Sequence, residues 1–224
     1  MREIIFDTET TGFDPAEGHR IVEIGCVETL NLIPTGRTFH KYVNPERDVP
    51  AEAYAVHGLS TEFLKDKPIF AEIAAEFLDF VGDARLVAHN AEFDMKFINA
   101  ELARLGFARI GSDRVVDTLE ICRRKFPGAP ATLDALCKRF GIDNSARTKH
   151  GALLDSELLA EVYLELMGGR QVGLSLVAEQ TVTAVVRRER VYREPRPHMP
   201  SAEEIAAHEA FIAGIKDAIW TRAS

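Results

Sequence analysis

Ile4-Ile5-Phe6-Asp7-Thr8-Glu9 places two carboxylates directly after a short apolar run. The run has the composition of a buried β-strand, in which residues two apart project to the same face. The side chains of Asp7 and Glu9 should therefore lie together, where they repel each other unless a proton or a cation is shared. A turn at the strand end is the alternative, because Asp, Thr and Gly12 all favour turns.

Around this strand, residues 1–169 alternate between strand-like and helix-like patterns. Further strands are predicted at residues 21–27, 38–43, 86–88 and 115–116. Helices are predicted at residues 70–81, 91–105, 119–126, 133–140 and 152–167. Three meandering strands followed by alternating helices and strands indicate an α/β domain, with a central mixed sheet flanked by helices.

Two further carboxylates fall on helix faces that should pack inward. Asp94 shares a stripe with Phe97, and Asp155 shares one with Leu159. A buried carboxylate without a partner is costly, so a salt bridge or a helix cap is the ordinary explanation for either residue. Two of them beside the strand-end pair favour a site for a hard divalent cation, Mg²⁺ or Mn²⁺. Asp117 instead suits a helix N-terminus.

His150 precedes Asp155 by five residues, and Gly151 indicates that this histidine lies in the loop before the helix. A histidine in a surface loop is the ordinary interpretation. Beside a phosphodiester, a neutral imidazole is suited to accept a proton from attacking water. Arg147 and Lys149 flank the histidine and would meet either phosphate or solvent.

The bulk composition narrows the protein class. A formal net charge of −8 argues against broad, nonspecific coating of nucleic acid. No apolar run is long enough to cross a bilayer, and the N-terminus does not have the pattern of a signal peptide. The cysteines, Cys26, Cys122 and Cys137, are widely spaced, which favours buried thiols in a reducing cytoplasm.

Three motifs resemble those of the DEDDh exonucleases, in the same order: Asp7-Thr8-Glu9, His89-Asn90-Ala91-Glu92-Phe93-Asp94 and His150-x4-Asp155. Through Val56-His57-Gly58 and residues 132–137, the chain also resembles the proofreading exonucleases of bacterial replicative polymerases. The similarity covers residues 4–169. It implies a ribonuclease-H-like exonuclease fold and 3′→5′ hydrolysis of single-stranded or mispaired DNA ends by a two-metal mechanism.

The resemblance also assigns roles to matching positions. Two divalent cations, Mg²⁺ or Mn²⁺, would be held by Asp7, Glu9, Asp94 and Asp155, and the general base would be His150. Weaker candidates for binding the terminal nucleotide are Thr10, His57, His89, Asn90 and Phe93. Ordinary alternatives exist for these positions: Thr10 as a turn cap, Phe93 as a core residue and His57 as a loop residue.

After residue 169 the pattern changes to a linker, residues 170–200, rich in Arg and Pro. Near its start, Gln171-Val172-Gly173-Leu174-Ser175-Leu176 resembles the peptide by which bacterial proteins bind the replication sliding clamp. Such peptides place an amide and two apolar anchors in a preformed pocket, here Gln171, Leu174 and Leu176. Packing of this segment on its own domain is the alternative.

Residues 201–224 predict a helical tail that begins with a capping box between Ser201 and Glu204. Its apolar stripe includes Ile205, Phe211 and Ile215, and needs a surface to cover, either its own domain or a partner. The resemblance implies that this tail binds the catalytic subunit of the replicative polymerase. The expected location is the bacterial cytoplasm, at the replication fork.

Two other functions fit parts of the pattern. A DEDDh exoribonuclease that trims RNA 3′ ends would use the same catalytic residues, because the chemistry takes place at phosphate. A catalytically silent adaptor between clamp and polymerase would need only the peptide and the tail. The clamp-like peptide favours DNA over RNA, and the full set of five catalytic positions argues against the adaptor.

Overall fold

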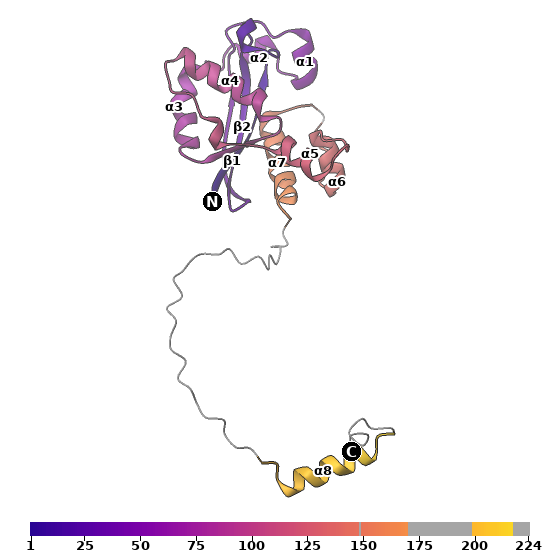
Figure 1. The fold of residues 1–224 in the computed structure, drawn as a ribbon. Helices are drawn as coiled ribbons and strands as arrows, with labels where there is room; N and C mark the ends of the chain where they lie inside the picture. The colour runs from indigo at the N-terminus through magenta and orange to yellow at the C-terminus, as the bar shows by residue number, and fades with distance from the viewer. Residues whose placement is uncertain (148, 170–198, 217–224) are drawn as a thin grey trace, which may run out of the picture. The chain divides into compact units, whose positions relative to one another are not determined.

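The computed structural model describes residues 1–147, 149–169 and 199–216, which fall into two separate units. The first unit holds the α/β domain, and the second holds one helix (Figure 1). The predicted clamp-binding peptide, residues 171–176, lies outside the described residues. Among the described helices, none is long and apolar enough to cross a membrane.

A five-stranded mixed sheet forms the centre of the first unit, in the order β3-β2-β1-β4-β5. The strands are β1 (Arg2–Thr10), β2 (Ile21–Leu30), β3 (Ile33–Tyr42), β4 (Arg85–Ala88) and β5 (Val115–Asp117). β1 pairs antiparallel with β2 and parallel with β4, so it lies at the junction of the two halves of the sheet. The carboxyl end of β1 therefore lies at the same edge of the sheet as the carboxyl ends of β4 and β5.

Helices cover both faces of this sheet (Figure 1). The seven α-helices of the first unit are α1 (Ala51–His57), α2 (Thr61–Leu64), α3 (Phe70–Val81), α4 (Ala91–Arg104), α5 (Thr118–Lys125), α6 (Leu133–Phe140) and α7 (Ala152–Leu166). Alternate residues of β1 serve the two layers, as the strand period requires. Ile4 and Phe6 pack with α3 and α4, whereas Ile5 packs with Leu159 and Tyr163 of α7.

The predicted mixed-sheet fold is confirmed, but several strands are longer than predicted. β2 continues through Glu28 and Thr29, which are polar yet buried. Arg2 and Arg37 donate to the Glu28 carboxylate over 2.6 and 2.9 Å, and these pairs allow acidic side chains in a strand interior. The periodicity of apolar residues does not predict a buried polar residue of this kind.

Two short helices, α1 and α2, were not predicted, and they change the place of one candidate residue. His57 is the last residue of α1 and is buried, so the alternative that placed it in a loop was wrong. Gly58 follows in the left-handed conformation, with φ of 75°, and caps the helix. A helix of one or two turns is too short to show a reliable period.

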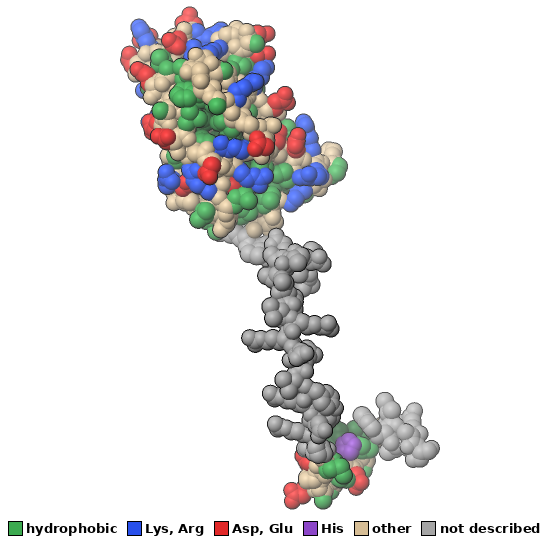
Figure 2. Space-filling model, turned by 60° about the vertical axis from the view of Figure 1, so that its left-hand side comes forward, with side chains coloured by type: hydrophobic (Ala, Val, Ile, Leu, Met, Phe, Trp, Pro, Cys, Tyr) green, Lys and Arg blue, Asp and Glu red, His purple; other side chains and the backbone are tan. Residues whose placement is uncertain are grey.

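The second unit consists of α8 (Ala202–Ala213) and the residues beside it. The predicted capping box is confirmed: the Glu204 amide donates to Ser201 Oγ, and the Ser201 amide donates to the Glu204 carboxylate. The helix ends at Gly214, earlier than predicted, and residues 217–224 lie outside the described residues. Figure 2 shows apolar side chains on the surface of this unit. Ile205 and Phe211 are exposed.

Candidate active site

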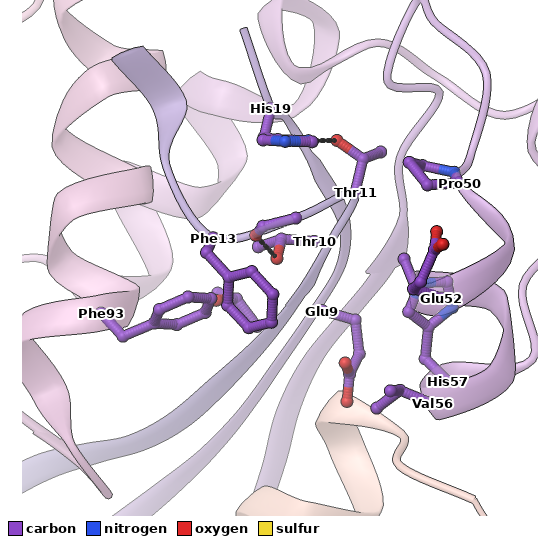
Figure 3. A pocket seen from close by; sticks show the side chains of 13 residues that line it. Glu9, Thr10, Thr11, Phe13, His19, Pro50, Glu52, Val56, His57 and Phe93 are labelled. Atoms are coloured by element: carbon purple, nitrogen blue, oxygen red, sulfur yellow. Dashed lines mark hydrogen bonds between the residues drawn. The ribbon is translucent and has the colours of Figure 1, made fainter. Parts of the chain in front are cut away.

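β1 carries the first two carboxylates of the site in its last four residues. Asp7 pairs with Gly25 of β2, and Glu9 pairs with Glu23. The Glu9 side chain is buried and points toward the beginning of α7 (Figure 3). Asp7 and Glu9 share one side of the strand, as the sequence predicted.

Asp94 joins them from the first turn of α4, where it is buried. Its Oδ1 atom accepts two hydrogen bonds from one residue of β1: 3.0 Å from the Thr8 amide and 2.7 Å from the Thr8 hydroxyl. Thr8 lies between the two carboxylates of β1, so these bonds fix α4 against the strand at the site itself.

Asp155 completes the set of four carboxylates from the first turn of α7. Its helix reaches the sheet because Gly25 has no side chain: a Cβ there would overlap the backbone of Ala152 and Leu153. Ser156 secures the contact by donating its hydroxyl to the Gly25 carbonyl over 2.9 Å. Gly25, which pairs with Asp7 in the sheet, is therefore the residue on which the helix carrying Asp155 packs.

His150 lies in the loop before α7, as predicted, and is exposed. Its Nδ1 atom is 3.3 Å from Asp155 Oδ2, and its amide donates to the Val56 carbonyl of α1 over 3.3 Å. Glu9, His150 and Asp155 each offer a ligand atom within 4.8 Å of the others. Within the described residues, this is the one set of three such groups.

The acidic groups of the site raise one another's pKa values. Burial and the charges of Asp94, Glu9 and Asp155 raise the pKa of Asp7 well above its usual range. Burial, followed by the charges of Asp155 and Glu23, raises the pKa of Glu9 to about 8. Burial likewise raises the pKa of Asp94 to about 7, against the opposing effect of the Thr8 hydrogen bonds. The cluster therefore favours a bound cation.

Arg147 was predicted to meet phosphate or solvent, but the structure pairs it with the carboxylates. Its Nε and Nη2 atoms donate to both oxygens of Asp155 over 2.6 and 2.8 Å, and Nη1 donates to Asp134 over 2.9 Å. Only 7% of its side chain is exposed. A charged residue beside a histidine in a predicted loop gave no sign of this inward position.

Candidate nucleotide contacts divide between two hollows. The first, of about 470 Å³, is lined by Glu9, Thr10, His57 and Phe93 (Figure 3). Phe93 projects into it from α4, and His57 lies across from it on α1. Sequence reasoning missed Phe13, which lies beside Phe93 and is 85% exposed. An aromatic residue beside Gly12, in the turn after the first motif, was the available signal.

The second hollow, of about 680 Å³, contains His89 and Asn90 together with Asp7, His150 and Asp155. His89 Nδ1 is 2.9 Å from the Thr118 hydroxyl, so this ring is fixed against α5. Asn90 begins α4 in the left-handed conformation, and its amide donates to Asp117 over 3.0 Å. Asp117 also caps α5, as predicted.

Comparison with known proteins agrees with this geometry. Residues 4–163 match the RNase_T family model, which describes an exonuclease. The chain is 50% identical to DNA polymerase III subunit epsilon of Rickettsia felis, over 96% of this chain and 97% of that protein. The same subunit of Escherichia coli is 46% identical, over 93% and 91%.

A solved structure of exonuclease X, in complex with 5′ overhanging duplex DNA, superposes with a TM-score of 0.60 and 25% identity. The superposition covers 74% of this chain and 90% of that one. Four carboxylates on β1, α4 and α7 thus lie in a fold that a DNA-bound exonuclease shares. The chain belongs to the RNase_T exonuclease family, among the epsilon subunits of DNA polymerase III.

Proposed function

We propose that the chain is the proofreading 3′→5′ exonuclease of a bacterial replicative polymerase, removing nucleotides singly from single-stranded or mispaired DNA ends. One observation carries this proposal: Asp7, Glu9, Asp94 and Asp155 come from three elements to one place, with His150 beside them. This constellation suits metal-dependent hydrolysis of a phosphodiester, and the chain is a member of an exonuclease family.

The donor set fits two divalent cations, Mg²⁺ or Mn²⁺. Four carboxylates are hard oxygen ligands. Burial and neighbouring carboxylates raise the pKa values of Glu9 and Asp94, and a bound cation would offset both effects. Asp7, Glu9 and Asp155 would hold one cation, and Asp7 and Asp94 would contribute to the second. When bound, such cations make water more acidic and stabilise negative charge at phosphate.

His150 is the proposed general base. Hydrolysis forms a bond between the water oxygen and phosphorus, transfers a proton to the imidazole and breaks the bond to the 3′-oxygen of the preceding nucleotide. Its loop position leaves the ring exposed at the rim of the carboxylate cluster, where water and substrate can reach it. Thus the base can approach the substrate without displacing α7.

The first hollow is the proposed seat of the terminal nucleotide. Aromatic rings of Phe13 and Phe93 line one side, where a base can stack. On the other side, His57 Nε2 is buried and has no hydrogen-bond partner among the described residues. A buried ring nitrogen without a partner is suited to a ligand that supplies the missing bond. Thr10 also lines the first hollow. His89 and Asn90 line the second hollow, which would hold the preceding nucleotide.

Digestion of matched 5′-labelled single-stranded DNA and RNA tests this function. With Mg²⁺ we expect a DNA ladder that shortens from the 3′ end and disappears with EDTA and in Asp7→Asn. Glu62→Asn is the matched control, because it removes an exposed carboxylate far along the chain from the motifs. Faster loss of RNA would instead indicate an RNA-trimming enzyme. No cleavage of either substrate would indicate a silent adaptor.

The tail and the linker are the proposed contacts with replication partners at the fork, in the cytoplasm. Phe211 is 69% exposed on α8, and Ile205 and Ile215 are exposed nearby, so this unit taken by itself does not bury these apolar side chains. We assign residues 201–224 to the catalytic polymerase subunit. The clamp would take Gln171, Leu174 and Leu176.

Binding of the full chain to each partner tests these two assignments separately. Phe211→Ser should weaken binding to the polymerase subunit while digestion of single-stranded DNA stays unchanged, and Glu203→Gln on the same helix is the control. Leu174→Ser should weaken binding to the clamp alone. Unchanged affinities would contradict the corresponding assignment.

A further inference from the structure

Arg147 places a permanent positive charge inside the carboxylate cluster. Its guanidinium grips Asp155 through two parallel hydrogen bonds of 2.6 and 2.8 Å. The side chains are only 7% and 5% exposed. A bidentate pair in such an enclosed setting is strong and directional.

The same guanidinium also contacts the proposed base. Its Nη2 atom is 2.8 Å from His150 Nδ1. The same atom is 3.4 Å from His150 Nε2. A guanidinium only donates, so a neutral ring accepts through the nitrogen that carries no proton. Arg147 thereby ties His150 to Asp155.

We propose that Arg147 is an internal counter-ion that occupies Asp155 in the metal-free protein and competes there with the incoming divalent cation. This proposal rests on the proposed function, since it takes Asp155 as a metal ligand. Both Asp155 oxygens bond to the guanidinium, and a divalent cation on the same carboxylate would repel it at close range. Metal binding is therefore an exchange of cations.

Asp134 gives the displaced guanidinium a second partner. This residue of α6 accepts from Nη1 over 2.9 Å, and 58% of its side chain is exposed. The guanidinium can release Asp155 while it keeps this bond, so the exchange does not require α6 or α7 to move. Release also breaks the hold on His150, which frees the base when the cation arrives. Arg147 is thus a positioning residue.

The exchange lowers the apparent affinity for metal, because only the fraction of molecules with Asp155 released can bind it. Removing the guanidinium should therefore tighten metal binding, the opposite of what loss of a merely structural residue would do. Arg123 provides the matched control: it lines the same hollow, is exposed, and has no ion pair among the described residues. Its removal changes the net charge equally.

Mn²⁺ binding to the full chain, measured from the electron paramagnetic resonance signal of free Mn²⁺, tests the proposal without reference to turnover. We expect Arg147→Met to lower the Kd roughly tenfold, the size of one lost charge-assisted contact, and Arg123→Met to change it by less than about twofold. Arg147→Gln keeps an amide donor but removes the charge, so it should also lower the Kd. This second variant allows the measurement if Arg147→Met does not fold.

Unchanged or weaker Mn²⁺ binding in both Arg147 variants would overturn the proposal. An equal gain in Arg123→Met would also overturn it, because the effect would then be general charge rather than occupancy of Asp155. Asp155→Asn distinguishes this failure from that of the proposed function. If that variant binds Mn²⁺ like the unaltered chain, Asp155 is not a metal ligand and the proposed metal site itself is wrong.

Discussion

Gly25 lies opposite Asp7 in the β1–β2 ladder and, on its other side, touches the first turn of α7. The closeness of helix and sheet at this point brings Asp155 to the strand that carries Asp7. A single methyl group at position 25 would meet backbone atoms of Ala152 and Leu153, which cannot move away as a flexible side chain would.

Gly25→Ala should therefore displace α7 and separate Asp155 from the other carboxylates. We expect a loss of about 1–3 kcal/mol in the free energy of unfolding, the usual cost of overpacking. A shift of about 1 Å at a catalytic group lowers turnover about 100-fold. Thermal unfolding and DNA digestion measure the two effects. Gly151→Ala, at the N-cap of the same helix but with no atom within 4 Å of the added methyl, should behave like the unaltered chain.

The Thr8 hydroxyl holds Asp94 against β1, so Thr8→Val should loosen this carboxylate. Valine keeps the shape and the strand preference but removes one of the two bonds to Asp94 Oδ1. We expect a loss of about 1.5–3 kcal/mol, typical of a hydrogen bond to a charged acceptor, together with weaker metal binding. Thr8→Ser retains the hydroxyl and should restore most of both. Equal losses in the two variants would contradict a role for this bond.

His150 lies in the same three-residue set as Glu9 and Asp155, so two roles are open to its imidazole: general base and metal ligand. Replacing the residue distinguishes them. A general base contributes about 100- to 10,000-fold to turnover, so His150→Ala should lose activity on this scale. Its Mn²⁺ affinity should remain close to that of the unaltered chain. A large fall in affinity would assign the imidazole to the metal instead.

The raised pKa of Glu9 predicts how the metal-free protein responds to pH. Burial lifts this pKa from 4.5 to about 8, so between these values the native chain binds more protons at Glu9 than the unfolded chain does. Stability contributed by this group is complete below pH 4.5 and is lost as the pH rises to about 8. Glu9→Gln should remove this loss.

Calorimetry with EDTA checks the sign. At about pH 8 we expect Glu9→Gln to melt about 3–6 °C above the unaltered chain, with the difference shrinking toward about pH 5. Divalent cations should stabilise the unaltered chain more than the variant, in which only the second cation keeps its full set of proposed ligands. Glu62→Gln, an exposed carboxylate on α2, is the control. A difference that does not vary with pH would contradict the assignment of this pKa.

The sequence allowed the sheet, the longer helices and the four carboxylates to be predicted, for a common reason. Apolar period reports which face is buried, and Asp94 and Asp155 interrupt that face. It could not predict α1, because one or two turns do not establish a period. The buried position of the Arg147 side chain was also not predicted. A charged residue in a loop carries no sequence pattern that distinguishes a buried ion pair from a solvated side chain.

The seating of α7 on Gly25 has a consequence for the timing of activity during synthesis. A nascent chain that has emerged only as far as α6 contains Asp7, Glu9 and Asp94 but not Asp155. Such a chain lacks one of the four carboxylates, so it should not hydrolyse DNA before α7 has been synthesised and has left the ribosome. A product terminated before α7 should be inactive for the same reason. Hydrolysis of DNA therefore begins only after α7, the last helix of the domain, packs against β2.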